Sequence, residues 1–379
     1  MTRSTHGLSG GAMVATILLL LALLPFERPL AQIQSSEVLA LTGARLFDGT
    51  GSPPVANATL LVSNGRVMAA GAAAAVQIPA GATRIDARGK TIIPGLVNAH
   101  GHVQVEQGSA LPVREDLLRR LRMYAHYGVT TVVSLGSGRA DEAPGIALRE
   151  EQRAGRADGA RLYTSGQAVS GRTPEAARES VDRLADLGVD YAKLRLNGNA
   201  NDPDFEAFRA QVEQAHQRGL RTAVHIFNLA DAQLAVDAGV DVIGHSVRDR
   251  DVTPAFIAAV KARSVHYVPT LTRDLSAFVY ESTPAFFTDP FFLRGRSLYE
   301  EQIGTLTDPA RQARVQADPG AQAIKPALEQ AKRNLKLLAD AGVAIAFGTD
   351  SGAAGSPGRW QGYFEHVELE LMVEAGLTP

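Results

Sequence analysis

The chain has 379 residues, of which 45% are hydrophobic and 21% are charged. This composition is typical of a soluble protein with a large core, and it excludes a disordered or fibrous chain. The 38 basic and 40 acidic side chains give a formal charge of −2, so we expect no general attraction to nucleic acid or to an anionic membrane. Because the chain has no cysteine, disulfides, thiolate metal sites and cysteine nucleophiles are excluded, and any transition metal must bind His, Asp, Glu or Lys.

Residues 1–31 have the pattern of a secretory signal peptide. Arg3 precedes an apolar run from Met13 to Leu24, which at about twelve residues is short for a bilayer span. We expect cleavage near Ala31, and an uncleaved N-terminal anchor is the alternative. Both interpretations predict an exported protein, periplasmic or extracellular, and the first predicts no stable membrane span after the signal is removed.

Residues 38–90 predict the N-terminal part of a small β-sandwich module. Strands are predicted at 38–44, 59–63, 66–70 and 83–86. Asn64 and Gly65 have the composition of a tight hairpin turn between the second and third of these strands.

From residue 91 onward, apolar strands alternate with amphipathic helices, which is typical of parallel βα units. Strands are predicted at 91–97, 129–135, 161–165, 191–196, 220–226, 240–244, 265–271 and 343–348. Helices are predicted at 114–127, 175–187, 203–218, 229–238, 254–261, 325–341 and 363–375. Eight units in about 280 residues favour an α/β fold, a (β/α)₈ TIM-type barrel over residues 91–379.

A long insertion at 272–323 follows the seventh predicted strand, so we expect it to overhang the face of the barrel where active sites form. The insertion contains Phe278, Phe286, Phe287, Phe291 and Phe292. These rings either line a substrate pocket or pack on one another as a lid.

Six ionisable side chains lie in or just after predicted strands of the barrel: His100, His102, Lys193, His225, His245 and Asp350. Taken singly, each has an ordinary structural interpretation, such as a hydrogen-bonded His or an outward-facing Lys. Because the carboxyl ends of barrel strands meet at one face, their joint placement predicts a common site. A lysine in a barrel interior is costly unless it is deprotonated, paired or covalently modified.

The segments at 94–102, 191–194, 223–228, 242–246 and 346–352 carry this set, and in this order they resemble the amidohydrolase superfamily. The resemblance is to the branch of imidazolonepropionase-like enzymes and metal-dependent, prolidase-like dipeptidases. It implies two divalent metal ions, above all Zn²⁺, with His100, His102 and Asp350 at one ion and His225 and His245 at the other. It also implies that Lys193 carries a carbamate derived from carbon dioxide and bridges the two ions.

This resemblance implies hydrolysis of an amide or peptide C–N bond by a hydroxide that the metals share, with Asp350 as the catalytic base and then the acid. An N-acyl amino acid or a dipeptide is the expected substrate type. Arg195, Arg248 and Arg273 are candidates to bind a substrate carboxylate, with surface salt bridges as the alternative. Asn228 either binds the substrate or caps a helix.

Several alternatives stay open on the sequence alone. One is hydrolysis of a cyclic amide or imidazolone, a lactone or a phosphotriester, and another is a truncated barrel that binds metal without turnover. Relatives usually continue past the eighth strand to complete the β-module, whereas this chain ends at Pro379, so we expect a fragment. The expected partner is a small-molecule or dipeptide-like substrate, not nucleic acid, and a homo-oligomer is left open.

Overall fold

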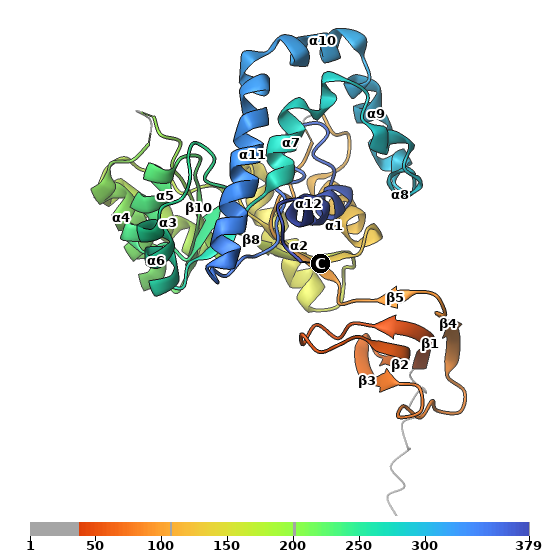
Figure 1. The fold of residues 1–379 in the computed structure, drawn as a ribbon. Coiled ribbons are helices and arrows are strands. Elements are labelled where there is room, and N and C mark those ends of the chain that lie inside the picture. The colour runs from red at the N-terminus through yellow and green to blue at the C-terminus, as the bar shows by residue number, and fades with distance from the viewer. Residues whose placement is uncertain (1–37, 107, 200–201, 379) are drawn as a thin grey trace, which may run out of the picture. The chain divides into compact units, whose positions relative to one another are not determined.

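The computed structural model describes residues 38–106, 108–199 and 202–378. The chain divides into two compact units, one ending at Pro94 and the other beginning at Gly95, and each is seen as a ribbon in Figure 1. The signal peptide predicted at 1–31 lies outside the described residues. In the described ranges, every helix is too short or too polar to cross a lipid bilayer.

The described part of the first unit is a single five-stranded sheet in the order β3-β2-β1-β4, with β5 also paired to β1. Its strands are β1 (Val38–Leu46), β2 (Val55–Ser63), β3 (Arg66–Ala72), β4 (Thr83–Asp86) and β5 (Thr91–Ile92). Asn64 and Gly65 have φ values of 51° and 68°, which suits the predicted two-residue turn. The second layer of the predicted sandwich is not found among the residues described for this unit.

The strand predicted at 91–97 is wrong as a single element. Thr91–Ile92 pairs with β1 in the first unit, whereas Leu96 begins β6 in the second unit. Pro94 and Gly95 separate the two pieces, because proline lacks the N–H that a continuous ladder needs and glycine weakens a strand.

The second unit contains two parallel sheets. The first has the order β6-β7-β8 and the second the order β12-β11-β10-β9. The strands are β6 (Leu96–Gly101), β7 (Val129–Ser134), β8 (Arg161–Thr164), β9 (Tyr191–Arg195), β10 (Arg221–His225), β11 (Val242–Gly244) and β12 (His266–Val268). This is an α/β architecture, but the strands are not joined into the closed eight-stranded sheet that we predicted.

Isolated contacts connect the two sheets. A parallel bridge joins Ala168 to Lys193 of β9, and another joins Tyr267 of β12 to Ile345. The Ala99 N–H of β6 donates to the Phe347 carbonyl at 2.8 Å. The order of neighbours is therefore that of a TIM-type barrel.

The predicted eighth strand at 343–348 is also wrong, since it is reduced to the bridge at Ile345. Directly after it, the N–H groups of Thr349 and Asp350 both donate to the His100 carbonyl, and Asp350 has a φ of 60°. The chain leaves the extended conformation at this point, because a left-handed residue cannot continue a ladder.

Helices cover both sheets. They are α1 (Val113–His126), α2 (Arg139–Arg153), α3 (Pro174–Asp186), α4 (Phe205–Gln217), α5 (Leu229–Ala238), α6 (Pro254–Ala262), α11 (Pro319–Asp340) and α12 (Tyr363–Glu374). Apolar side chains of α3 to α6 pack on β9 to β12 in one core, and Figure 1 shows these four helices together in green. Leu117, Leu121 and Leu148 of α1 and α2 pack on β7 and β8 in another. Sequence analysis missed α2, because Pro144 and Gly145 inside it disfavour a helix.

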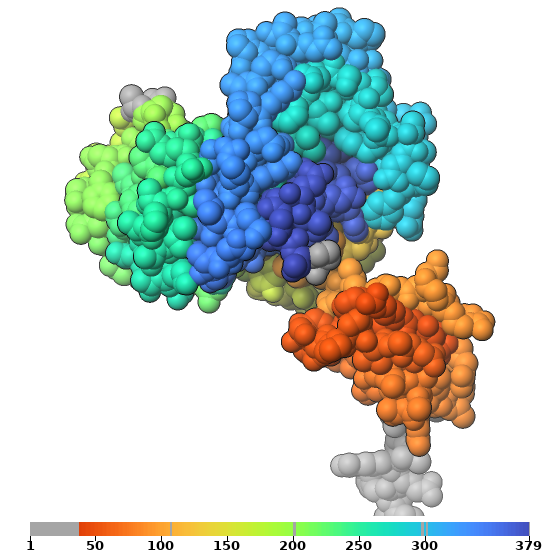
Figure 2. Space-filling view, viewed as in Figure 1, coloured from red at the N-terminus to blue at the C-terminus, as the bar shows by residue number. Residues whose placement is uncertain are grey.

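The insertion after β12 is helical. It comprises α7 (Leu271–Phe278), α8 (Pro290–Leu293), α9 (Arg296–Leu306) and α10 (Pro309–Ala317), with 3₁₀ turns at Val279–Glu281 and Ala285–Thr288. Asp289, Asp308 and Asp318 each precede a proline and cap α8, α10 and α11, as expected for an N-cap followed by proline in the first turn. Figure 2 shows the insertion, cyan to light blue, beside α11.

The phenylalanines of the insertion pack on one another. Phe286, Phe287, Phe291 and Phe292 belong to a cluster that also contains Trp360, whereas Phe278 packs in a different cluster with α11. The Phe292 ring is fully buried, and its centroid lies 5.3 Å from that of Trp360. Of the two alternatives, the structure therefore favours packing of these rings on one another.

We expect Phe292→Ala to lower the free energy of unfolding by about 3–5 kcal/mol, because it removes a buried ring and leaves a cavity. Urea denaturation measures this change. Leu293→Ala in the same helix is the control, since Leu293 is 38% exposed. Equal losses in the two variants would contradict the packing described for the insertion.

Candidate metal centre

The six ionisable residues singled out in the sequence lie around one cavity. His100 is in β6, Lys193 in β9 and His225 at the end of β10, whereas His102, His245 and Asp350 follow strands or the bridge segment. All six line a cavity of about 260 Å³. The strands bring them together because parallel strands of a barrel end on one face.

Two glycines at the site make room for neighbouring side chains. A Cβ atom on Gly244 would lie 2.8 Å from the His100 ring, and one on Gly101 would lie 2.8 Å from the Tyr124 hydroxyl. Real Cβ atoms do not approach other atoms so closely. Glycine at these positions therefore lets the His100 ring enter the cavity and lets β6 pack against α1.

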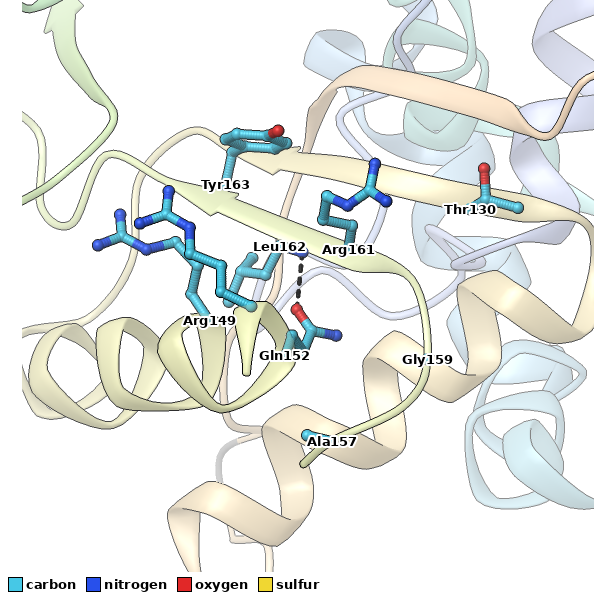
Figure 3. Close-up of a pocket in the computed structure, with 9 residues that line it drawn as sticks. Thr130, Arg149, Gln152, Ala157, Gly159, Arg161, Leu162 and Tyr163 are labelled. Atoms are coloured by element: carbon cyan, nitrogen blue, oxygen red, sulfur yellow. Dashed lines mark hydrogen bonds between the residues drawn. The ribbon is translucent and has the colours of Figure 1, made fainter. Parts of the chain in front are cut away.

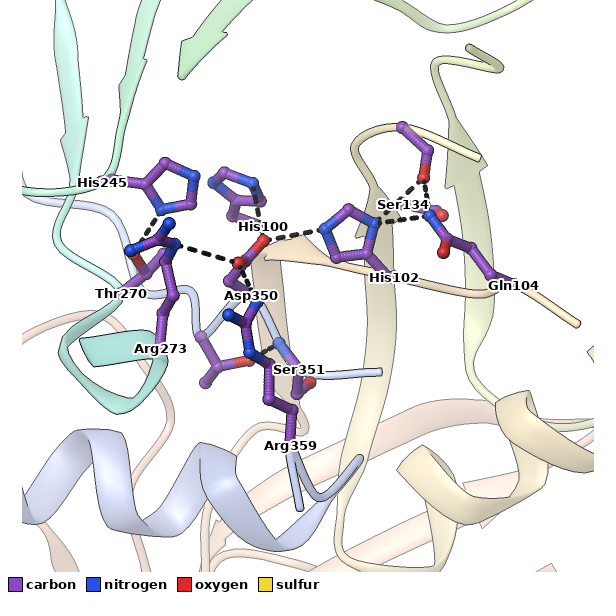
Figure 4. A network of polar contacts seen from close by, with 12 residues as sticks. His100, His102, Gln104, Ser134, His245, Thr270, Arg273, Asp350, Ser351 and Arg359 are labelled. Atoms are coloured by element: carbon purple, nitrogen blue, oxygen red, sulfur yellow. Dashed lines mark hydrogen bonds and ion pairs between the residues drawn. The ribbon is translucent and has the colours of Figure 1, made fainter. Parts of the chain in front are cut away.

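The contacts among the six residues are short. The Asp350 Oδ1 lies 2.8 Å from His102 Nε2 and 3.4 Å from His100 Nε2, as Figure 4 shows. Lys193 Nζ lies 3.1 Å from His100 Nε2. The His245 ring centroid is 4.5 Å from that of His100 and 4.4 Å from that of His225.

Three of these side chains satisfy the spacing of ligands to a single ion. Ligand atoms of His100, His245 and Asp350 all lie within 4.8 Å of one another. In the part of the chain that the structure describes, the buried His100 Nδ1 has no hydrogen-bond partner. A buried polar atom without a partner is costly, so this ring is well suited to gain a ligand.

Three of the histidines are held in the neutral form that binds metal. Burial, together with the charge of nearby Lys193, lowers the pKa of His225 to about 2. Burial also holds the pKa values of His100 and His245 well below the usual range. Neutral imidazoles with a carboxylate and without thiolates fit Zn²⁺ or another first-row divalent ion.

The electrostatics of Lys193 and Asp350 are complementary. Burial lowers the pKa of Lys193 to about 7, although Asp350 opposes this shift, so much of the amine is neutral near pH 7 and able to act as a nucleophile. Burial alone would raise the pKa of Asp350, but the contact with His102 and the charge of Arg359 hold it well below the usual range. Asp350 is therefore ionised.

Three residues at the site have left-handed backbones although none is glycine. The φ values are 80° at His245, 50° at Thr270 and 60° at Asp350. Each such residue costs about 1–3 kcal/mol unless its surroundings impose the conformation, and such residues cluster at functional sites. The Thr270 Oγ1 lies 2.7 Å from His245 Nδ1, which leaves His245 Nε2 available for a ligand.

The cavity wall carries more positive than negative groups. Arg195, Arg273 and Arg359 line it, and Asp350 is the carboxylate among the described lining residues. Arg359 Nη1 lies 2.6 Å and Arg273 Nε 3.5 Å from Asp350 Oδ2. Arg359 was not predicted, because it lies in an irregular segment where no periodicity indicates which way a side chain points.

Gln104 is a second lining residue that sequence reasoning missed. Its Nε2 donates to the Gly136 carbonyl at 2.6 Å and lies 3.1 Å from His102 Nδ1. Its Oε1 accepts from the Ala354 N–H at 2.9 Å. Gln104 thus joins His102 to the segment after Asp350.

Two predicted substrate-binding residues lie elsewhere. Arg248 is fully buried beside Asp274, with Nη1 3.3 Å from Oδ2, and its guanidinium covers the Phe227 ring. Asn228 caps α5, since its Oδ1 accepts from the Asp231 N–H at 2.7 Å. Neither lines the cavity, and neither do the phenylalanines of the insertion.

A separate cavity of about 350 Å³ lies beside β8 and the C-terminal part of α2 (Figure 3). Arg149 and Arg153 in its wall pair with Asp190 and Glu150. Gln152 accepts from the Leu162 N–H at 3.0 Å. Its described lining contains no His, Asp or Glu, so it lacks the ligand chemistry of the first cavity.

Comparison with known proteins agrees with this description. Residues 91–378 match the sequence model of the amidohydrolase family. An enamidase of Eubacterium barkeri is 29% identical over 198 residues, which is 48% of this chain and 47% of the enamidase. The chain thus spans about half the length of this curated relative.

Solved structures show the same fold. A protein of Bifidobacterium longum that has been proposed to be a prolidase has a TM-score of 0.68 and 24% identity, covering 91% of this chain and 80% of its own. An Xaa-Pro dipeptidase with methionine in its active site has a TM-score of 0.65 and 19% identity, with coverages of 90% and 84%. These similarities support the TIM-type fold of residues 91–378.

We expect Zn²⁺ to stabilise the metal-stripped chain, by about 2.7 kcal/mol at one hundred times its Kd. Thermal denaturation with and without Zn²⁺ measures this. His245→Ala should lose most of the stabilisation, whereas His216→Ala, which removes an exposed ring paired with Asp241, should retain it. A zinc effect of the same size in both variants would place the metal elsewhere.

Proposed function

The chain belongs to the amidohydrolase family, and from this premise we propose that it is a metal-dependent hydrolase that cleaves an amide or peptide C–N bond. The observation that carries the proposal is the meeting of four histidines, Lys193 and Asp350 at one cavity. The enamidase and the Xaa-Pro dipeptidase among the similar proteins support an amide or peptide substrate.

The proposal assigns two divalent ions, preferably Zn²⁺, to this cavity. One would be held by His100, His102 and Asp350, the other by His225 and His245. When bound, such ions polarise a scissile carbonyl and lower the pKa of an attacking water. In the proposed active form, the neutral Lys193 amine would have reacted with carbon dioxide: an N–C bond would form as one C=O π bond opens, a proton would leave, and the carbamate would offer its oxygens as ligands to the ions.

Asp350 is the proposed proton carrier. Its Oδ1 contacts His102 and His100, whereas its Oδ2 faces the arginines of the cavity wall. We assign the proton to Oδ2, which would take it from the attacking water and give it to the leaving amine. The low pKa of Asp350 makes its carboxylate a weak base. In this proposal, substrate binding therefore moves Arg359 away from Oδ2 before the proton is taken from water.

The arginines favour a substrate with a carboxylate. Arg195, Arg273 and Arg359 line the cavity, and a guanidinium can bind a carboxylate through two parallel hydrogen bonds. An N-acyl amino acid or a dipeptide has this group beside the C–N bond that is cleaved. No Phe, Tyr or Trp side chain lines the described part of the cavity, so the carboxylate rather than a bulky apolar group is the proposed determinant of binding.

We expect Asp350→Asn to reduce turnover about 10²- to 10⁴-fold, the usual contribution of a general acid–base. Steady-state kinetics on an N-acyl amino acid measure turnover, and metal analysis of the same samples should show most of the metal retained. Asp237→Asn, on the exposed face of α5, is the matched control. Near-normal turnover in Asp350→Asn would exclude the assigned role.

We expect Arg359→Ala to raise KM about 10- to 100-fold for a substrate with a free carboxylate, since a hydrogen bond to a charged group contributes about 1.5–3 kcal/mol. The same substrate with a carboxamide should show little change. Arg250→Ala, which removes a 72% exposed guanidinium paired with Asp249, serves as the control. An equal rise in KM for the carboxylate and the carboxamide substrate would mean that Arg359 acts on Asp350 alone. Separately, activity of the wild-type chain confined to lactones would contradict C–N cleavage.

A further inference from the structure

Two carboxylates of α12 are buried behind the metal centre. Glu365 and Glu368 both have 0% exposure, and burial raises the pKa of both, that of Glu368 to about 7. Neither forms an ion pair with a Lys or Arg in the part of the chain that the structure describes. A buried carboxylate without a counter-charge is costly, so the hydrogen bonds that these two groups accept must offset that cost.

Glu365 holds the turn that contains Asp350. Its Oε1 accepts from the Thr349 hydroxyl at 2.9 Å and from the Ser351 hydroxyl at 2.7 Å. These two residues flank Asp350, whose φ is 60°. The contacts fix the residues on both sides of a strained position, which is the condition under which such a position persists.

Glu365 also reaches the first strand of the site. Its Oε1 accepts from Asn98 Nδ2 at 2.5 Å, and Asn98 Oδ1 in turn accepts from the His100 N–H at 2.9 Å. One carboxylate therefore connects α12 to the His100 backbone, through Asn98, and to the two residues that flank Asp350.

Glu368 holds the turn that orients His245. Its Oε1 accepts from the Leu271 N–H at 2.8 Å, and its Oε2 accepts from the Thr272 N–H and hydroxyl, both at 2.7 Å. The preceding residue, Thr270, has a φ of 50°, and its hydroxyl contacts His245 Nδ1. The Glu368 carboxylate thus acts on His245 through a strained turn.

We propose that Glu365 and Glu368 are positioning residues, through which α12 sets the geometry between Asp350 and His245. The two turns are also joined directly, because the Thr272 hydroxyl lies 3.1 Å from the Thr349 carbonyl. The inference rests on the proposed function of the cavity as a metal centre. It assigns the two carboxylates no contact with metal or substrate, since neither lines the cavity.

The test compares Glu365→Gln and Glu368→Gln with the wild-type chain. Each substitution keeps the shape of the side chain. In Glu368→Gln an NH₂ group must face an N–H or O–H donor, because both oxygens accept hydrogen bonds. In Glu365→Gln the NH₂ group can take the position of Oε2, which has no partner among the described residues, and the change removes the negative charge that strengthens the three hydrogen bonds to Oε1. We expect Co²⁺ to bind about 10- to 100-fold more weakly, as when partners of metal ligands are removed in other sites. The visible absorption of bound Co²⁺ should also change, because it reports ligand geometry.

Glu370→Gln is the matched control. Glu370 lies on the exposed face of the same helix, so the same chemical change there should leave Co²⁺ affinity and the absorption spectrum unaltered. The thermal midpoint of each metal-free variant separates positioning from general support. Weaker Co²⁺ binding with a preserved midpoint supports the proposal, and a loss of affinity that only follows a loss of metal-free stability contradicts it.

Failure of the inference and failure of the proposed function give different results. A wild-type chain that does not bind Co²⁺ would refute the metal centre itself. A wild-type chain that binds it, with the same affinity and spectrum in both glutamine variants, would refute the positioning role. If the glutamine variants do not fold, Thr270→Val is the substitute, because it removes only the hydroxyl that contacts His245 and nearly preserves volume. A changed Co²⁺ spectrum in this variant supports the connection from Glu368 through Thr270 to His245, and an unchanged spectrum contradicts it.

Discussion

The burial of several ionisable groups in one small cavity is the constraint on which the rest of the second unit depends. Water cannot solvate these groups fully, so each must be neutral, paired or bound to something. His100, His225 and His245 stay neutral, and Asp350 is ionised beside Arg359 and His102. Lys193 sits between these cases, with a pKa of about 7. Neutral imidazoles beside an ionised carboxylate are groups that a divalent cation can bind.

The support for this cavity comes from behind the strands. Glycine at 244 leaves space for the His100 ring, and the carboxylates of α12 accept hydrogen bonds from the two turns that complete the site. The aromatic packing of the insertion includes Trp360 and Phe364, which adjoin or belong to the same helix. Strain at Asp350 and Thr270 is thus balanced by packing and polar contacts that lie outside the cavity.

The sequence predicted the parts of this arrangement that depend on local pattern. Apolar runs that end in His or Asp indicated where His225 and His245 would lie, and the spacing of His100 and His102 placed both rings on one face of an extended chain. Pro144 concealed α2 because its local preference opposes the packing that forms the helix. The approach of Arg359 to Asp350, and of Glu365 to Asn98, depends on how distant segments meet, which periodicity cannot indicate. In the first unit, the strands that local pattern predicted lie in one sheet, and the predicted second layer is not found among the described residues.

The division of the second unit into two sheets has a consequence for how the chain responds to metal. His100 belongs to the sheet that contains β6, and His102 directly follows that strand. Lys193 and His225 belong to the sheet that contains β9 to β11, and His245 directly follows β11. Ions bound as proposed would cross-link the two sheets, much as a disulfide ties distant parts of a fold. In a chain without cysteine, metal binding would then also hold the two sheets of the second unit together. The metal-free form would be more open and more sensitive to proteases.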